Sequence, residues 1–123
     1  MAQVRARDTK PELIVRRLAH SLGYRYRLYG QLPGRPDLVF ASRRKVLFVH
    51  GCFWHRHKNC RKTTMPAANR EFWLAKFKAN VRRDRRNVRE LERAGWGVIV
   101  VWQCETSHRR ELADRLRQEL GKL

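Results

Sequence analysis

The sequence has 123 residues, which fits a single domain over residues 1–123 whose first eight residues, 1–8, form a flexible arm. Its 29 Lys and Arg residues outnumber 11 Asp and Glu, and the formal charge of +18 indicates a polyanionic partner, with nucleic acid the leading candidate. No apolar run approaches the ~20 residues that span a bilayer, and the start lacks a signal core, so we expect a cytoplasmic protein with reduced cysteines and no membrane partner.

The N-terminal part of the chain predicts a helix, a strand and a loop. Thr9 and Glu12 form a capping box, and apolar residues at helical spacing continue from there to Gly23. Alternation with a period of two predicts a half-buried strand over residues 24–28. The Gly- and Pro-rich segment 30–36 predicts an irregular loop.

Two apolar runs, 38–40 and 45–50, predict strands joined by a hairpin turn over 41–44. Antiparallel pairing of these strands places Asp37, at the start of the first, near His50, at the end of the second. We expect a catalytic site where these two residues converge.

The C-terminal half predicts a helix, a strand and a second helix. A long helix over 71–94 includes the arginine-rich segment 82–86, which is most simply a solvated helix face. The continuous apolar run 96–102 predicts a strand buried on both faces, and residues 107–120 predict the last helix. The order of elements favours an α/β fold with a mixed sheet flanked by helices.

Residues 49–60 concentrate histidines, cysteines and large aromatics. Cys52, His57 and Cys60 have the spacing of metal ligands, and Cys104 follows the last strand. Thiolates with an imidazole suit tetrahedral zinc, and four protein ligands make the zinc structural. The alternative is three unrelated buried thiols.

His50 and His55 are not needed for the zinc. Together with Asp37 they supply a carboxylate for a hard divalent cation beside imidazoles that can move protons. Phosphodiester hydrolysis needs these groups. Glu12 is either a further carboxylate at this metal or only part of the capping box. Each histidine alone would more often be an ordinary surface residue.

Phe53 and Trp54 are adjacent aromatics between the zinc ligands. We expect at least one to project outward, where it can stack on bases or wedge between them. The alternative is that both pack in the core.

Five segments resemble the very-short-patch-repair (Vsr) DNA mismatch endonucleases: residues 33–37, 49–55, 71–73, 80–84 and 95–102. The resemblance implies a restriction-endonuclease-like fold of the PD-(D/E)xK superfamily with a structural Zn²⁺. It implies Mg²⁺-dependent nicking of one strand on the 5′ side of the thymine in T:G mismatches, which arise when 5-methylcytosine is deaminated. We expect a monomer bound to such duplex DNA, with other repair proteins as possible partners.

The resemblance also assigns roles to residues near the catalytic metal. It makes Asp37 the Mg²⁺-binding carboxylate, with the backbone carbonyl of Val49 as a second ligand. His50 becomes a partner on the phosphate side, His55 the general base or the group that positions it, and Glu12 a residue that acts on metal-bound water.

The remaining roles concern zinc and DNA. The resemblance matches the zinc ligands to Cys52, His57, Cys60 and Cys104, and the wedge into the duplex to Phe53, Trp54 and Trp73. Arg82 and Arg86 on the long helix are expected phosphate contacts in this reading.

The chain departs from the family pattern at two places. Val49 replaces a threonine, and the interval from His57 to Cys60 is one residue longer. Phe48 and His50 occupy the positions of the Glu-x-Lys half of the superfamily motif, as in other Vsr-like enzymes. Two competing hypotheses are a zinc-stabilised DNA-binding module without catalysis and a small basic ribonucleoprotein component.

Overall fold

Within residues 9–28 and 30–122, which the computed structural model describes, three α-helices and four strands follow one another in the predicted order. The arm predicted over residues 1–8 lies outside this part of the chain. The elements are α1 (Lys10–Ser21), β1 (Arg27–Leu28), β2 (Leu38–Phe40), β3 (Lys45–His50), α2 (Arg70–Arg93), β4 (Gly97–Trp102) and α3 (Arg109–Leu120), with 3-10 helices at Ala41–Arg43 and Gln103–Ser107.

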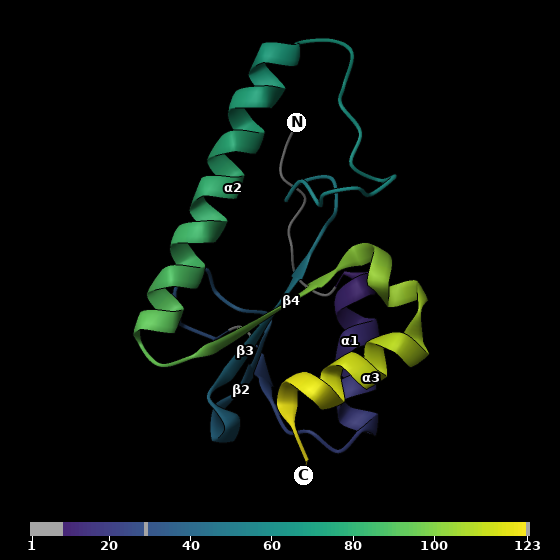
Figure 1. Cartoon of the computed structure of the whole chain (residues 1–123), viewed down its shortest axis with the longest axis vertical. Coiled ribbons are helices and arrows are strands. Elements are labelled where there is room, and N and C mark those ends of the chain that lie inside the picture. The colour runs from purple at the N-terminus through teal and green to yellow at the C-terminus, as the bar shows by residue number, and fades with distance from the viewer. Residues whose placement is uncertain (1–8, 29, 123) are drawn as a thin grey trace.

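The strands form one mixed sheet, as the sequence predicts, and their order in it is β1-β2-β3-β4. β2 pairs antiparallel with both β1 and β3. β3 and β4 are parallel, because the chain returns through α2 between them. α2 lies along one face of the sheet, and α1 and α3 cover the other (Figure 1).

Each face of the sheet has its own core. Toward α1 and α3 the strands bury their larger apolar side chains, namely Leu38, Phe40, Leu47, Ile99 and Val101. Toward α2 they bury a smaller set, Val39, Val46 and Phe48, together with Leu91 of the helix. The alternation along each strand therefore matches a sheet packed between two helical layers.

α1 starts and ends where its sequence predicts. The Thr9 hydroxyl accepts the backbone N–H of Glu12 at 3.4 Å, which satisfies a donor that the first turn leaves unpaired. Gly23 follows the helix at φ 94°, a left-handed conformation that favours glycine. Local signals are sufficient to define this helix.

The strand predicted over residues 24–28 is wrong in length and burial. Only Arg27 and Leu28 pair with β2, and both are exposed. Tyr24 and Tyr26 instead pack edge-on against Phe40, at ring distances of 6.4 and 6.0 Å. The alternation reflects this packing of two tyrosines over the core, and the three-residue β2 offers no longer partner for pairing.

β4 is not buried on both faces as predicted. Only Ile99 and Val101 are buried, whereas Val98 and Val100 are half-buried, and Trp96 precedes the strand. The reason is that the N-terminal half of α2 extends beyond the sheet and covers none of it (Figure 1). The last helix also starts later than predicted, at Arg109, because a 3-10 helix occupies residues 103–107.

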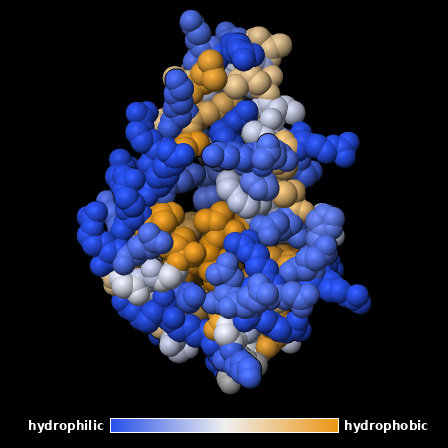
Figure 2. Space-filling view, in the orientation of Figure 1, coloured by the Kyte–Doolittle hydropathy of each residue, from blue (hydrophilic) through white to orange (hydrophobic). Residues whose placement is uncertain are grey.

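α2 is largely solvated. Of its 24 residues only Phe77 and Leu91 are buried, and the predicted solvated face is confirmed, since four arginines of 82–86 are exposed. The face of the molecule in Figure 2 is mostly hydrophilic, with hydrophobic side chains gathered in a recess in its middle. Among the described residues, no helix has the length and apolar character that a membrane span requires.

Candidate active site and metal cluster

A cleft of about 610 Å³ opens where the end of β3, the loop before β2 and α2 meet. The hairpin brings Asp37 to the end of β3 as predicted: its N–H donates to the Leu47 carbonyl at 3.0 Å, and its Oδ2 accepts the Val49 N–H at 2.6 Å. The polar and charged groups that line the cleft are Glu12, Arg35, Asp37, His50, His55, Lys76, Asn80, Arg83, Asp84, Arg86 and Asn87.

The environment of Asp37 disfavours its charge. Burial raises the pKa of its carboxyl to about 6, although the Val49 N–H acts in the opposite direction, and the nearby Glu12 raises it further. A cation beside this carboxyl would favour its ionised form and lower its pKa. Oxygen ligands of this kind suit Mg²⁺.

Glu12 lies both at the helix start and at the cleft. It is 3 % exposed and lines the cleft with Asp37. Its carboxylate also accepts the Thr9 hydroxyl at 3.1 Å and the Arg16 guanidinium at 3.3 Å. The helix start thus fixes a second carboxylate at the cleft.

His50 and His55 stack face to face, with ring centroids 3.8 Å apart and an interplanar angle of 5°. Burial, followed by the neighbouring His55, lowers the pKa of His50 to about 3, so His50 is neutral at physiological pH. His50 can therefore offer a phosphate a neutral N–H but no positive charge.

Sequence reasoning missed Asp84 of α2 as a functional candidate. Its Oδ2 lies 2.6 Å from His55 Nδ1, and the two side chains are only 20 % and 23 % exposed. Because an ionised carboxylate only accepts hydrogen bonds, the neutral form of the His55 ring carries its proton on Nδ1 and leaves Nε2 as an acceptor. Asp84 belongs to the segment 80–84 that resembles the Vsr family, which could have indicated it. The sequence does not show its pairing with His55, because 29 residues separate the two along the chain.

Within the described part of the chain, His50, His55 and Asp84 form one of two groups of side chains that could bind a metal ion. Ligand atoms of His50, His55 and Asp84 all lie within 4.8 Å of one another. The close bond between His55 and Asp84 already uses one nitrogen and one carboxylate oxygen. This arrangement fits proton transfer by His55 better than it fits a closed metal site.

The cysteine cluster brings together the four residues predicted to hold zinc. Ligand atoms of Cys52, His57, Cys60 and Cys104 lie within 4.8 Å of one another, and His57 Nδ1 is 3.6 Å from the Cys52 Sγ and 3.5 Å from the Cys104 Sγ. His57 also stacks on Trp102 at 4.2 Å. Three thiols and one imidazole fit a tetrahedral zinc ion.

The thiols of this cluster differ in their tendency to ionise. Burial, with hydrogen bonding to Cys52, raises the pKa of Cys104 to about 12. A backbone N–H from Lys62 lowers the pKa of Cys60 to about 7. Zinc at the cluster would favour thiolates at all three positions.

The aromatic residues of the loop pack on one another. Phe53 and Trp54 are both half-buried, and their ring centroids lie 6.1 and 5.9 Å from that of Trp73. Phe53 also packs edge-on against Phe77 of α2. Neither projects fully outward as expected, and neither enters the main core. Among the residues that the structure describes, Phe72 is the exposed aromatic, at 58 %.

Arg56 attaches this loop to α2. Its guanidinium stacks on Phe77 at 3.9 Å and donates to the carbonyls of Phe53 and Thr64 at 3.2 and 2.9 Å. The aromatic group is thus held at a fixed place beside the cleft, which Trp54 also lines.

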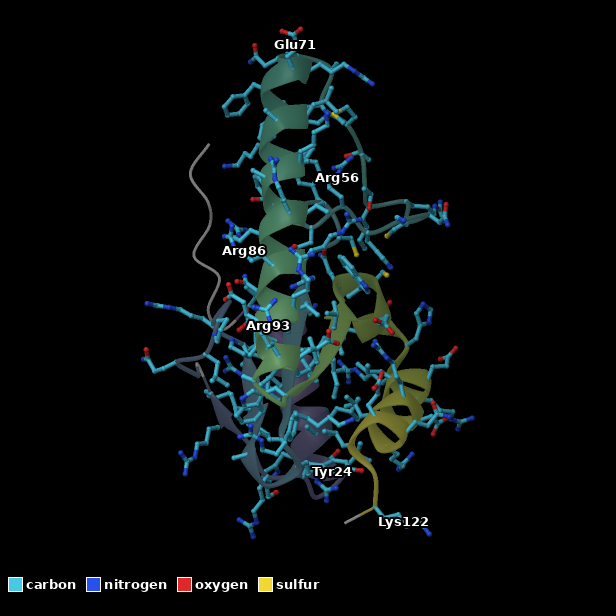
Figure 3. The ribbon with its side chains drawn as sticks, turned by 60° about the vertical axis from the view of Figure 1, so that its left-hand side comes forward. Tyr24, Arg56, Glu71, Arg86, Arg93 and Lys122 are labelled. Atoms are coloured by element: carbon cyan, nitrogen blue, oxygen red, sulfur yellow. The ribbon has the colours of Figure 1, made fainter. Side chains whose placement is uncertain are left out.

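The two arginines expected to contact phosphate lie in different surroundings. Arg86 lines the cleft, whereas Arg82 lines a separate groove of about 410 Å³ with Arg56 and Lys78. Figure 3 shows Arg86 and Arg56 on opposite sides of α2. The structure therefore brings only Arg86 to the candidate site.

The fold and the site together define a small, strongly basic α/β protein with carboxylates and imidazoles in one cleft and a Cys3His cluster beside it. A family model described as DNA mismatch endonuclease Vsr matches residues 1–62. Relatives of known name resemble nearly the whole chain.

The type II nicking enzyme V.XorIIP of Xanthomonas oryzae pv. oryzae is 53% identical over 121 residues, which cover 98% of this chain and 88% of that protein. The type II nicking enzyme V.NmeAIP of Neisseria meningitidis is 41% identical over 98% of this chain and 88% of its own length. The DNA mismatch endonuclease Vsr of Escherichia coli is 42% identical over 97% of this chain and 76% of its own length. The chain belongs to the Vsr family of DNA mismatch endonucleases.

Proposed function

We propose that this endonuclease nicks one strand of duplex DNA on the 5′ side of the thymine in T:G mismatches, in a Mg²⁺-dependent reaction that serves very-short-patch repair. The observation that carries the proposal is the convergence of Asp37 with the His55–Asp84 pair in one cleft of a protein with formal charge +18. The mixed sheet with helices on both faces supports a restriction-endonuclease-like fold of the PD-(D/E)xK superfamily.

Asp37 and the backbone carbonyl of Val49 would hold the catalytic Mg²⁺. The Val49 N–H points at Asp37, and the N–H and C=O of one strand residue point to the same side, which supports this pairing. The raised pKa of Asp37 and the nearby Glu12 supply the oxygen-rich, cation-seeking surroundings that Mg²⁺ prefers. When bound, Mg²⁺ would stabilise negative charge on the phosphate and lower the pKa of a coordinated water.

His55 would act as the general base. Its Nε2 takes a proton from the attacking water, while Asp84 fixes the tautomer and stabilises the imidazolium that forms. The water oxygen bonds to phosphorus, the P–O bond to the leaving sugar oxygen breaks, and that oxygen takes a proton from solvent. His50, neutral and stacked on His55, donates an N–H on the phosphate side, and Glu12 orients the water.

A structural Zn²⁺ at Cys52, His57, Cys60 and Cys104 would fix the loop that carries the aromatics. The cluster joins the segment after β3 to the 3-10 helix after β4, so one ion would restrain two distant parts of the chain. With four protein ligands this zinc takes no part in the chemistry.

Phe53, Trp54 and Trp73 would wedge into the duplex beside the mismatch. They form one partly exposed group next to the cleft, supported from behind by Phe77. A mismatched step is easier to unstack than a paired one, so the wedge favours a T:G pair before any hydrogen bond reads the bases.

A nicking assay tests the proposal directly. Duplexes that differ only at one position, T:G, T:A or C:G, are incubated with and without Mg²⁺, and the cut strand and position are mapped. We expect Mg²⁺-dependent cutting of the thymine strand of T:G alone. Equal cutting of all three duplexes would contradict mismatch specificity, and cutting without divalent cations would contradict the metal assignment.

The wedge has its own test. Trp54→Ala should reduce the preference for T:G over matched duplex by about tenfold or more, because stacking contributes about 1–3 kcal/mol per base, and should change matched-duplex binding little. The exposed Phe72, changed to Ala, serves as the control for loss of an aromatic outside the group. An unchanged preference in Trp54→Ala would show that recognition lies elsewhere.

A further inference from the structure

The loop before β2 is held rigidly against α2. A turn closes over residues 32–35, with the Arg35 N–H donating to the Leu32 carbonyl at 2.8 Å and Gly34 at φ 78°. A Cβ on Gly34 would come within 2.9 Å of the Asn87 side chain, so the backbone lies directly on the helix. Pro33 and Gly34, the two central residues, are sufficient to produce this turn.

Arg35 is strained in a way that the turn does not explain. Its φ is 50°, in the left-handed region that ordinary side chains avoid, and it precedes Pro36, which favours an extended conformation. Strain of this kind persists where the surrounding structure or a ligand compensates for it.

The other strained residues have visible compensation. Within the part of the chain that the structure describes, four more non-glycine residues have positive φ: Arg44, Arg56, Asn59 and Asn69. Asparagine tolerates this conformation. The Arg44 guanidinium bonds the Ala94 carbonyl and stacks on Trp96, and Arg56 makes similar contacts with Phe77 and the loop.

Arg35 differs from both of these arginines. Its side chain is exposed and lines the cleft two residues before Asp37, and it forms no hydrogen bond or ion pair with another described residue. Asp37, Glu12 and Asp84 line the same cleft, yet none is its ion-pair partner. An exposed arginine without an ion-pair partner among the described residues, at the lining of this cleft, is available to an anion that comes from outside.

We propose that Arg35 is a catalytic residue whose guanidinium binds the non-bridging oxygens of the scissile phosphate. The inference rests on the proposed nuclease function and extends it. Arg35 forms and breaks no covalent bond: its N–H groups donate to oxygens whose negative charge grows as the water attacks, in the forked geometry that suits phosphate. The turn closed by the Arg35 N–H holds the backbone of Arg35 two residues before Asp37.

Arg35→Gly separates the side chain from the backbone strain. Glycine adopts φ 50° freely, so this variant should unfold at a temperature a few degrees higher, about 2–5 °C, than the parent protein. Its single-turnover rate of nicking should fall by about 10²–10³-fold, the loss typical of one donor to a developing charge. Arg35→Lys keeps the charge but not the fork and should recover only part of the rate.

Arg44→Gly is the matched control, since it removes an arginine with the same backbone conformation outside the cleft. Its nicking rate at saturating DNA should stay within about twofold of the parent, as expected for a residue remote from the transition state. Phosphorothioate substitution of each non-bridging oxygen gives a second readout. The rate penalty at the oxygen that Arg35 contacts should shrink in Arg35→Gly, and a merely structural role would not change it.

The results distinguish this inference from the function on which it rests. If the parent protein cuts T:G duplexes and Arg35→Gly keeps its saturating rate, or loses only DNA affinity, Arg35 is not catalytic. If Arg35→Gly unfolds at a lower temperature, the residue is structural and the inference fails as well. If the parent protein cuts no duplex, the proposed function fails first.

Discussion

At the scale of single residues, ionisation of the Asp37 carboxyl is less favourable in the folded protein than in the unfolded chain. Burial raises its pKa to about 6, whereas the unfolded chain has the ordinary value of 3.8. A raised pKa means that the contribution of this carboxyl to stability is complete below about pH 4 and is lost as the pH rises through 6. The loss gives Asp37 a measurable signature apart from activity.

In Mg²⁺-free buffer, Asp37→Asn should therefore increase the free energy of unfolding at pH 8 by about 1–2 kcal/mol, discounted for partial exposure, and by nearly nothing at pH 4. Asparagine is neutral at both pH values and can still accept the Val49 N–H. Urea unfolding of both proteins at pH 4, 6 and 8 measures the difference. A variant less stable than the parent at pH 8 would contradict the raised pKa.

Asp37→Asn should also abolish nicking while leaving mismatch binding largely intact. Mg²⁺ needs the carboxylate, whereas removing a negative charge lessens the repulsion of phosphate. Binding is measured without turnover and nicking in excess Mg²⁺. Retained nicking would show that the catalytic metal lies elsewhere.

His55 and Asp84 should behave as one unit. His55→Ala should reduce the nicking rate by about 10²–10⁴-fold, as expected for a lost general base. Asp84→Ala should produce much of the same loss, and the double variant should be no slower than His55→Ala, because each change disables the same proton transfer. A loss in the double variant equal to the product of the two single losses would contradict the pairing.

At the scale of elements, the Cys3His cluster connects two segments that are far apart in the sequence and follow neighbouring parallel strands. Cys104 lies in the 3-10 helix after β4, and the other three candidate ligands follow β3. Cys104→Ser should lose about one zinc per chain and lower the unfolding midpoint by more than about 10 °C, because metal binding is coupled to folding. Metal analysis and thermal unfolding test this, with Ser107→Ala in the same 3-10 helix as the control.

Zinc content decides how this variant is interpreted. If the folded, active parent protein contains no zinc, the metal assignment is wrong, whatever Cys104→Ser does. If zinc is present and the variant unfolds like the parent, the cluster binds the ion without supporting the fold.

Elements defined by local signals could be predicted from the sequence, and α1 and the β2–β3 hairpin are examples. The Thr9 cap and the left-handed Gly23 act within a few residues, and a short turn fixes the antiparallel register. The hairpin in turn sets Asp37 beside Val49, so part of the candidate site was also predictable.

Features that depend on distant packing could not be predicted in this way. Asp84 meets His55 only because α2 crosses beside the loop, 29 residues along the chain. The exposure of Phe53 and Trp54 is set by Trp73 and Phe77 on that helix, and the hydrophobic run of β4 gives no indication that α2 covers only part of the sheet. In each case tertiary contact overrides the local pattern.

At the scale of the whole molecule, the basic residues of α2 line two separate hollows. Arg86 lines the cleft with Lys76 and Arg83, whereas Arg82, one turn earlier on the helix, lines the separate groove. The formal charge of +18 draws any duplex toward the protein. Only basic residues that contact the phosphates of the duplex release counterions from the DNA on binding.

Arg86→Ala should consequently weaken binding to matched and T:G duplexes alike, and should reduce the slope of log K against log salt concentration by about 0.9, the effect of one phosphate contact. Arg82→Ala removes the same charge four residues earlier on the same helix, so it is the matched control and should leave that slope nearly unchanged. Affinities of both variants across a salt series for both duplexes provide the comparison. Equal losses of slope would mean that the duplex contacts both flanks of α2, and a loss confined to Arg82→Ala would place it in the groove instead of the cleft that holds Asp37 and His55.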